Sequence, residues 1–226
     1  MSNTDRSVGA NVSGDIASRD GENGLSGSLN LNFMGSAGQS FGCWNANGLN
    51  ITLNGDANDY VGKGMNGGKI IIKNDADFAI NDETSLLDGN TCLYGSSGGE
   101  VYISGSVGER FAVRNSGAKA VIEGAGDPCC EYMTGGHVTI LGNVGLNFAA
   151  GMTGGFAYVL DEDRTFFDKC NRGLVGLERI TTEEMQPHRK HLKEILSNHY
   201  KYTNSKKAQE IIDDFDKFES HFWLVV

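Results

Sequence analysis

The sequence predicts an all-β solenoid, a column of stacked β-coils, followed by a pair of C-terminal helices. Three observations support this fold class. A phrase of about 18 residues recurs along the chain, which is the signature of a repeat architecture. A pair of glycines precedes each strand-like run, and the pattern changes to helical periodicity after residue 180.

The recurring phrase opens on a glycine, turns at a second glycine cluster and closes on an alternating β-branched run. Copies of it open at Gly35, Gly55, Gly89, Gly105, Gly124 and Gly142. The segment near residues 74–88 does not match the phrase. Such a unit must stack on its neighbours to bury its apolar face, and it is shorter than helical repeats, whose periods begin near about 33 residues. We therefore expect about seven coils, each about 4.8 Å from the next.

The closing runs predict strands that together form one wall of the solenoid. Glu100–Ser104 and His137–Leu141 are examples, with β-branched and aromatic residues on alternating faces. Glycine pairs such as Gly135-Gly136 and Gly154-Gly155 stand just before these runs. We expect them at corners, because glycine adopts a positive φ without steric cost.

The two ends of the predicted solenoid have their own pattern. Residues 1–34 are polar and glycine-spaced, with three aliphatic residues at helical spacing and a strand from Leu29 to Phe33. We expect this segment to form a short helix and a first coil that cap the core, as terminal units of solenoids do. With a last extended piece at residues 174–177, the predicted solenoid domain spans residues 1–180.

Residues 181–226 are predicted to form a helical extension packed on the solenoid. Thr181 and Glu184 fit a capping box for a first helix that ends near Tyr200. Asn204 or Ser205 caps a second helix. The positions of the apolar stripe are Leu192, Ile195, Leu196 and His199 on the first helix, and Ala208, Ile211, Ile212, Phe215 and Phe218 on the second.

The apolar stripe of this helical pair must cover either the flank of the solenoid or another chain. The apolar residues 222–226 at the end of the chain predict a docked strand or a truncated connection.

Composition excludes several functional classes. The net charge of −10 and the pI near 4.9 weigh against a nucleic-acid or anionic-membrane partner. The sequence contains neither an apolar run of membrane-spanning length nor an apolar signal core at its start, so we expect a cytoplasmic protein. The five cysteines lack CxxC spacing and are expected as free, buried thiols: Cys43, Cys92, Cys129, Cys130 and Cys170.

Two residue pairs are weak candidates for a metal site. His188 and His191 are three residues apart, but no third ligand stands at a suitable spacing, so solvated histidines are favoured. Cys129 and Cys130 are adjacent and would point to opposite faces of an extended chain, so they would not readily bind one ion together.

Two further patterns are weak candidates for catalysis or phosphate binding. Asp127 and Glu131 fit an acid/base pair, but four-residue spacing in a turn-rich coil favours hydrogen bonds at corners. Gly62-Lys63-Gly64 lacks the remaining residues of a phosphate-binding loop. We therefore assign no catalytic, cofactor-binding or metal-ligating residue.

Five sequence segments are more specific than the repeat of about 18 residues alone. They are GSAGQSFG from Gly35, GDANDYVGKGMNGGKIII from Gly55, GERFAVRNSGA from Gly108, CEYMTGGHV from Cys130 and GLNFAAGMTGGFAYVLDED from Gly145. These phrases resemble the C-terminal GXGXG domain of the glutamate synthase large (alpha) subunit. The resemblance extends to DRSVGANVSGDIA near the start and HYKYTNSKKAQEII in the tail, and so covers essentially the whole chain. In that family the domain is a right-handed parallel β-helix.

The resemblance implies a non-catalytic structural and interdomain scaffold of glutamate synthase, an oxidoreductase of glutamate biosynthesis. In that family an amidotransferase domain releases ammonia from glutamine for transfer to 2-oxoglutarate. A second domain, which holds FMN and an iron–sulphur cluster, reduces the resulting iminoglutarate. The resemblance names these domains or subunits as partners and places no cofactor in this chain. It also implies that the chain is either a separately encoded subunit or an excised fragment.

Charged residues at outward turns are the candidates for interdomain contact. They are Asp59, Lys63, Glu109, Arg110, Arg114, Asp127 and Glu131, all on the glycine-rich side of the coils. The resemblance implies that this side docks the FMN-binding domain, with Arg110 and Arg114 forming charge-assisted hydrogen bonds. A scatter of charges for solubility is the alternative.

Two other functional classes stay open at this point. One is the related GXGXG component of a formylmethanofuran dehydrogenase. The other is a free-standing β-helix binding module with its own ligand or activity on a lateral groove.

Overall fold

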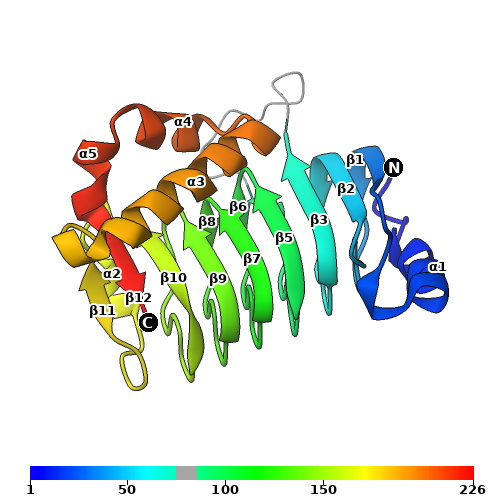
Figure 1. Ribbon diagram of the computed structural model, residues 1–226. Coiled ribbons are helices and arrows are strands. Elements are labelled where there is room, and N and C mark those ends of the chain that lie inside the picture. Colours follow the sequence, from blue (N-terminus) through cyan, green and yellow to red (C-terminus); the bar gives the residue numbers. More distant parts are fainter. Residues whose placement is uncertain (75–85) are drawn as a thin grey trace.

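The structure, a computed structural model, describes residues 1–74 and 86–226 and shows a β-solenoid of about six turns with C-terminal helices. In Figure 1 the coils stack as a column, with the N-terminus at one end and helices along one flank. The solenoid prediction is confirmed, but two parts of it were wrong. Helices make up 25% of the described residues, so the content is mixed rather than all-β, and the column has about six turns rather than about seven. The non-matching segment near residues 74–88 lies largely outside the described residues.

The main sheet forms one long wall of the column. Its principal strands are β1 Leu29–Ala37, β2 Leu49–Ala57, β3 Asn66–Lys73, β5 Gly98–Ile103, β7 Ser116–Ile122, β9 Thr134–Ile140 and β10 Gly154–Leu160. These strands pair in this order, all parallel. A second, smaller parallel sheet consists of β4 Leu86–Asp88, β6 Ser106–Val107 and β8 Gly124–Ala125.

The chain leaves the coil path after β10, which explains the missing seventh turn. The short helix α2 (Phe166–Lys169) replaces part of that turn, and Cys170 keeps a single parallel bridge with Phe148. The sheet then continues through β12 (Phe222–Val225), which is antiparallel to both β10 and β11 (Leu177–Arg179). The docked C-terminal strand predicted from the apolar end of the chain is therefore present.

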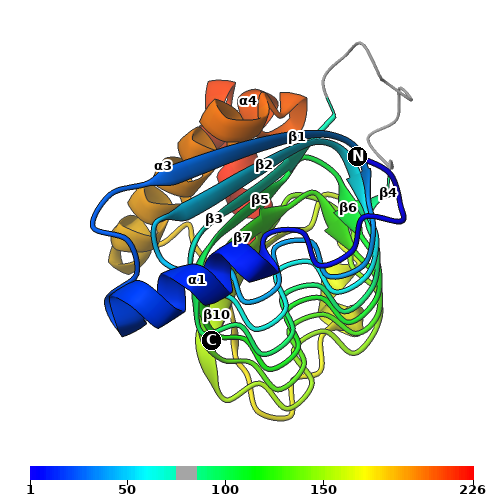
Figure 2. The same cartoon turned by 90° about the vertical axis from the view of Figure 1, so that its right-hand side faces the viewer.

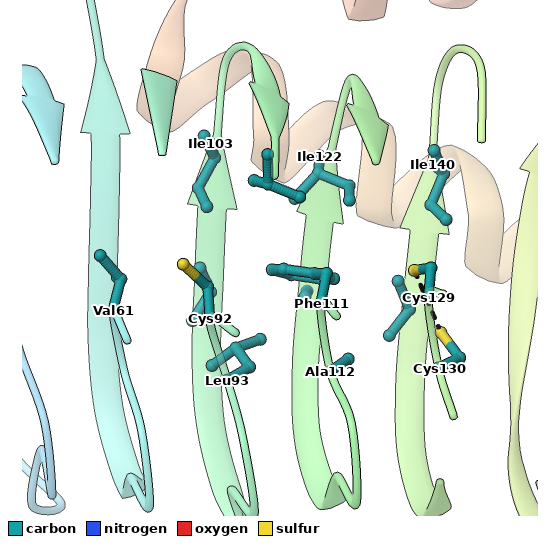
Figure 3. Close-up of a cluster of buried hydrophobic side chains, with 14 of the residues drawn as sticks. Val61, Cys92, Leu93, Ile103, Phe111, Ala112, Ile122, Cys129, Cys130 and Ile140 are labelled. Carbon is teal, nitrogen blue, oxygen red and sulfur yellow. Dashed lines mark hydrogen bonds between the residues drawn. The ribbon is translucent and has the colours of Figure 1, made fainter. Parts of the chain in front are cut away.

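Equivalent side chains stack along the interior of the column. Ile51, Ile70 and Val101 are in register on neighbouring strands, and the ladder continues through Ala120 and Val138. All five side chains are buried. Figure 3 shows a facing interior cluster with Val61, Cys92, Phe111 and Cys129 on successive coils. Each coil thus buries its interior apolar residues against its two neighbours, as expected for a repeat protein.

The glycine pairs lie at corners, as predicted. Gly136 and Gly155 have φ angles of 76° and 75°, in the left-handed region. A Cβ atom on Gly155 would lie 2.6 Å from the carbonyl oxygen of Gly136 on the neighbouring coil. Glycine is therefore required at this corner both for its conformation and for the close approach of the next coil.

An N-terminal helix covers one open end of the column. Helix α1 (Ala10–Asp20) lies across the end of the coils in Figure 2, and a short 3-10 turn (Gly21–Asn23) follows it. Ile16 is buried in the main core, and Val8 and Val12 pack against it. The short capping helix expected for residues 1–34 is present.

The C-terminal helices cover the outer face of the main sheet. They are α3 Gln186–Thr203, α4 Lys206–Asp213 and α5 Phe215–Phe218, with short 3-10 turns at Glu183–Met185 and Glu219–His221. A second apolar cluster joins Leu192, Leu196 and Ile211 to outward residues of the strands such as Tyr102 and Tyr158. The apolar stripe therefore covers the flank of the solenoid.

The helix boundaries differ in part from the sequence prediction. Ser205 caps α4, because its hydroxyl accepts a hydrogen bond from the Ala208 amide. The predicted capping box at Thr181 and Glu184 was wrong, since Glu184 lies in a 3-10 turn and α3 begins only at Gln186.

Candidate functional site

The predicted contact residues lie on one wall of the column, formed by the turns between strands. We define this turn wall as residues 39–44, 59–64, 90–95, 109–114, 127–132 and 146–151. Its backbone alternates between left-handed and right-handed residues; Arg110, Ala112 and Arg114 have φ angles of 63°, 56° and 57°. The amides of such residues bond alternately to the coils on either side. The Ala112 amide donates to the Cys92 carbonyl oxygen at 2.9 Å, and the Arg114 amide donates to the Glu131 carbonyl oxygen at 2.9 Å.

This hydrogen bonding aligns outward-facing residues in columns. Three of the predicted acidic residues, Asp59, Glu109 and Asp127, fall in one column at the corner that opens the wall. The column is built by side-chain acceptors: Asp59 Oδ1 accepts from the Asn90 amide at 2.7 Å, and Asn90 Oδ1 accepts from the Glu109 amide at 2.7 Å. The carboxylate of half-buried Asp59 therefore takes part in the coil-to-coil hydrogen bonding.

The remaining predicted residues occupy three other columns. Arg110 follows the acidic column, Lys63 and Glu131 share the next one, and Arg114 lies in the last. The Lys63 ammonium lies 5.3 Å from the centre of the Tyr60 ring. Asp127 and Glu131, considered as an acid/base pair, lie in different columns. All seven predicted residues thus share one wall but do not converge on a point.

Large exposed side chains share the last column with Arg114. Trp44 is 61% exposed and Tyr132 is 53% exposed. Three other coils carry glycine at this left-handed position, namely Gly64, Gly95 and Gly151. Trp44 lies over Gly64 and Tyr132 over Gly151 on the next coil, at the position where a Cβ atom would otherwise stand. We name Trp44, Arg114 and Tyr132 the aromatic–arginine column.

The aromatic–arginine column carries backbone strain that glycine would avoid. A non-glycine residue in the left-handed region costs about 1–2 kcal/mol. Arg114 is exposed, and within residues 1–74 and 86–226 it forms no ion pair. Trp, Tyr and Arg are also the residue types that dominate the binding energy of protein interfaces. This column is therefore the strongest interface candidate on the turn wall.

The histidine prediction was wrong. His188 and His191 are half-buried and pack between α3 and the sheet, with both Nδ1 atoms facing the Tyr158 hydroxyl at 2.8 and 3.4 Å. The His191 ring lies 4.9 Å from that of His137. Burial and nearby positive charge lower the pKa of His137 to about 4. This cluster attaches α3 to the sheet.

The prediction for the adjacent cysteines was also wrong. Cys129 and Cys130 are both buried, and their sulfur atoms are 3.7 Å apart. They do not point to opposite faces, because Cys130 has a φ of 59° and the chain there is not extended. Burial raises the pKa of the Cys129 thiol, which keeps it protonated and unreactive. All five cysteines are free and buried, as predicted.

Sequence reasoning missed a polar contact between the helices and the solenoid. Glu123, between β7 and β8, accepts a hydrogen bond from the Ser205 hydroxyl and lies 3.3 Å from Nε2 of buried His199. His199 was visible in the sequence as a polar residue in the apolar stripe of α3, but its partner lies 76 residues away. Only the tertiary structure brings these groups together.

The described part of the chain holds neither a metal centre nor a membrane-spanning helix. Among residues 1–74 and 86–226, no group of three or more His, Cys, Asp or Glu side chains could hold a metal ion. None of the helices in that part of the chain has the length and apolar character needed to cross a membrane.

Comparison with known proteins identifies the family of the solenoid. The model of the GXGXG motif matches residues 1–226. The chain is 50% identical over 224 residues to ferredoxin-dependent glutamate synthase 2 of Synechocystis, and 51% identical over 224 residues to the chloroplastic ferredoxin-dependent glutamate synthase 2 of Arabidopsis thaliana. Each alignment covers 99% of this chain but only 14% of the relative, so the chain spans about one seventh of their length. The chain therefore belongs to the GXGXG family and is homologous to the C-terminal region of glutamate synthase.

Proposed function

We propose that this chain is a non-catalytic structural and interdomain scaffold of a glutamate synthase. The observation that carries the proposal is an identity of 50% over 99% of the chain to a ferredoxin-dependent glutamate synthase. In such an enzyme the remaining domains would take ammonia from glutamine and use 2-oxoglutarate to form glutamate. The right-handed winding of the β-helix and a cytoplasmic location are parts of the same proposal. The names of the relatives favour this function over a formylmethanofuran dehydrogenase component or a free-standing module.

The cysteines of this chain do not fit the iron–sulphur cluster of such an enzyme. Clusters are held by thiolates. Here the cysteines are buried on separate coils, apart from the adjacent pair, and burial raises the pKa of Cys43, Cys92, Cys129 and Cys170. In the proposed function the cluster and FMN belong to the partner domain.

The turn wall is the proposed contact with the FMN-binding domain. Arg110 and Arg114 are exposed, lie in two different columns of the turn wall and form no ion pair within the described residues. Carboxylates of a partner would bind them through charge-assisted hydrogen bonds, while Trp44 and Tyr132 would supply apolar area.

Complementation tests the scaffold function. We expect that the Synechocystis enzyme, prepared without its own matching region, regains glutamate formation from glutamine and 2-oxoglutarate when this chain is added. Neither part alone should be active. Activity of the truncated enzyme without any added chain would contradict the scaffold function.

Charge reversal tests the docking wall separately. The double variant Arg110→Glu and Arg114→Glu should lose co-purification with the truncated enzyme, while its melting temperature stays close to that of the original chain. Reversal of Arg19 and Lys190, exposed on α1 and α3, is the matched control and should leave co-purification intact. If instead the double variant unfolds, these arginines brace the column and the contact face lies elsewhere.

A further inference from the structure

A cavity lies at the C-terminal end of the solenoid, away from the turn wall. Its volume is about 270 Å³, and it is lined by residues that include Asp161, Arg164, Phe167, Arg179 and Trp223. These residues come from the segment after β10, from α2 and from the antiparallel strands β11 and β12. The volume lies below the range of about 300–1,000 Å³ that is typical of larger ligands, so it suits a small molecule.

Two arginines, Arg164 and Arg179, line this cavity. The Arg179 guanidinium stacks over the Trp223 ring at 3.5 Å from its centre, and it donates to the Ser220 carbonyl oxygen at 3.1 Å. Arg164 is exposed. Within residues 1–74 and 86–226, neither arginine forms an ion pair. Both guanidinium groups therefore keep donors that an oxyanion can use.

Among the described residues that line the cavity, Asp161 is the one acidic residue, and both of its oxygens accept hydrogen bonds. Oδ2 of Asp161 accepts a hydrogen bond from the Trp223 indole at 2.8 Å, and Oδ1 accepts from the Phe166 amide at 3.0 Å. Asp161 is buried, so its negative charge stays near the cavity. The formal charges of Arg164, Arg179 and Asp161 sum to a single net positive charge in the lining. A monoanion balances this charge, whereas a dianion would place excess negative charge beside Asp161.

We propose that this cavity binds a small monocarboxylate with a short apolar stem. The carboxylate lies between Arg164 and Arg179, whose planar guanidinium groups match its geometry. The stem lies against Phe167 and Trp223, whose rings are 6.4 Å apart. This site is independent of the proposed scaffold function, since none of its residues belongs to the turn wall.

The two tryptophans of the chain provide the readout and its internal control. Trp223 lines the cavity, whereas Trp44 lies on the turn wall. We expect titration of the full chain with sodium butyrate to shift the indole N–H resonance of Trp223 in a saturable way. The Trp44 resonance should not move, and the Trp44→Phe and Trp223→Phe variants assign the two signals.

Arginine variants connect the signal to the cavity. Arg164→Gln should weaken butyrate binding about tenfold, the effect expected for loss of a charge-assisted hydrogen bond. Arg172→Gln is the matched control: Arg172 is exposed and stacks on Phe167, with its guanidinium carbon 3.9 Å from the ring centre, but it does not line the cavity. Butyrate affinity of this control should change by less than about twofold.

Three outcomes would overturn the proposal. The first is that butyrate leaves the Trp223 resonance unmoved. The second is tighter binding of inorganic phosphate than of butyrate at matched ionic strength, which would assign the cavity to a different oxyanion. The third is equal loss of affinity in the Arg164 and Arg172 variants, which would show that only the general positive charge of this end matters.

Discussion

The left-handed backbone conformation of individual residues allows the coils to stack closely. At corners such as Gly155, the left-handed conformation and the neighbouring carbonyl leave no room for a side chain. On the turn wall the same conformation is tolerated at Arg110 and Arg114, because their side chains point into solvent. The difference between the two positions is space, since both have a positive φ.

Replacement of Gly155 by valine should destabilise the chain by about 1–3 kcal/mol through backbone strain and the clash with Gly136. The free energy of unfolding from urea denaturation measures this effect. Gly14→Ala is the matched control, because Gly14 lies inside α1 with nothing within 4 Å of an added Cβ. The control should be stabilised by about 0.5–1 kcal/mol. A neutral result for Gly155→Val would mean that this corner does not limit the fold.

His137 makes the stability of the chain depend on pH. Its pKa is lowered to about 4 by burial first, and then by the nearby His191 and Lys119. A histidine in an unfolded chain has a pKa of about 6.5. Between about pH 6.5 and 4, the unfolded state therefore binds a proton at this residue that the folded state does not bind. This histidine therefore costs no stability above about pH 6.5 and destabilises the fold progressively as the pH falls towards 4.

His137→Phe should flatten this part of the pH profile, because phenylalanine keeps the stacking on Phe156 without a titrating group. Thermal melting between about pH 6.5 and 4 provides the measurement. The variant should lose less stability over this interval than the original chain, by up to about 3 kcal/mol. Parallel profiles for the two proteins would show that His137 does not control the acid sensitivity.

The outer face of the main sheet is polar near the N-terminal end of the column, and the C-terminal helices cover it nearer the other end. On β2 the outward residues are polar, and Asn50 donates to Asn30 across the strands at 2.9 Å. From Ile71 onwards the outward ladder becomes apolar through Tyr102 and Val121, and the C-terminal helices cover it. The outward residues of each strand therefore specify whether water or a helix lies above it.

Ser205 connects two elements, since its hydroxyl caps α4 and also donates to Glu123 of the solenoid. Ser205→Ala should reduce the free energy of unfolding by about 1–2 kcal/mol. Ser197→Ala is the matched control: Ser197 is exposed on α3 and bonds only to the Lys193 carbonyl of its own helix. Equal stability of the two variants in urea would show that the Glu123 contact contributes little.

At the scale of the whole molecule, the helices complete a surface that the solenoid cannot cover alone. Tyr158, Leu141 and Val121 are buried beneath them. A chain that ends at residue 180 also loses β12, the strand between β10 and β11.

We expect this shortened chain to aggregate or to bind a hydrophobic dye strongly, because removal of the helices exposes a contiguous apolar face. Size-exclusion chromatography of the full chain and of residues 1–180 makes the comparison. A monodisperse shortened chain with a cooperative melt would show instead that residues 1–180 form an autonomous domain.

The sequence by itself determined what repeats. The period, the glycine corners and the alternating runs predict a stacked column, because in a solenoid each unit contacts only its neighbours and local pattern is nearly the whole fold. The sequence also predicted the cap of α4 and the apolar stripes of the helices, because these features depend on short-range spacing. The turn wall was also predictable in outline, since outward charges recur at one phase of the repeat.

Only the tertiary structure decided the contacts between parts that do not share the repeat. The docking of α3 on the sheet brings His188 and His191, which the sequence predicted to be solvated, against the Tyr158 hydroxyl and leaves them half-buried. The cavity at Trp223 is lined by segments that come before and after the helices in the sequence. No local spacing of residues could therefore predict it. Such contacts depend on where the helical extension folds back along the column. The repeat pattern determines the path of each coil. It does not determine where the C-terminal helices pack on the column.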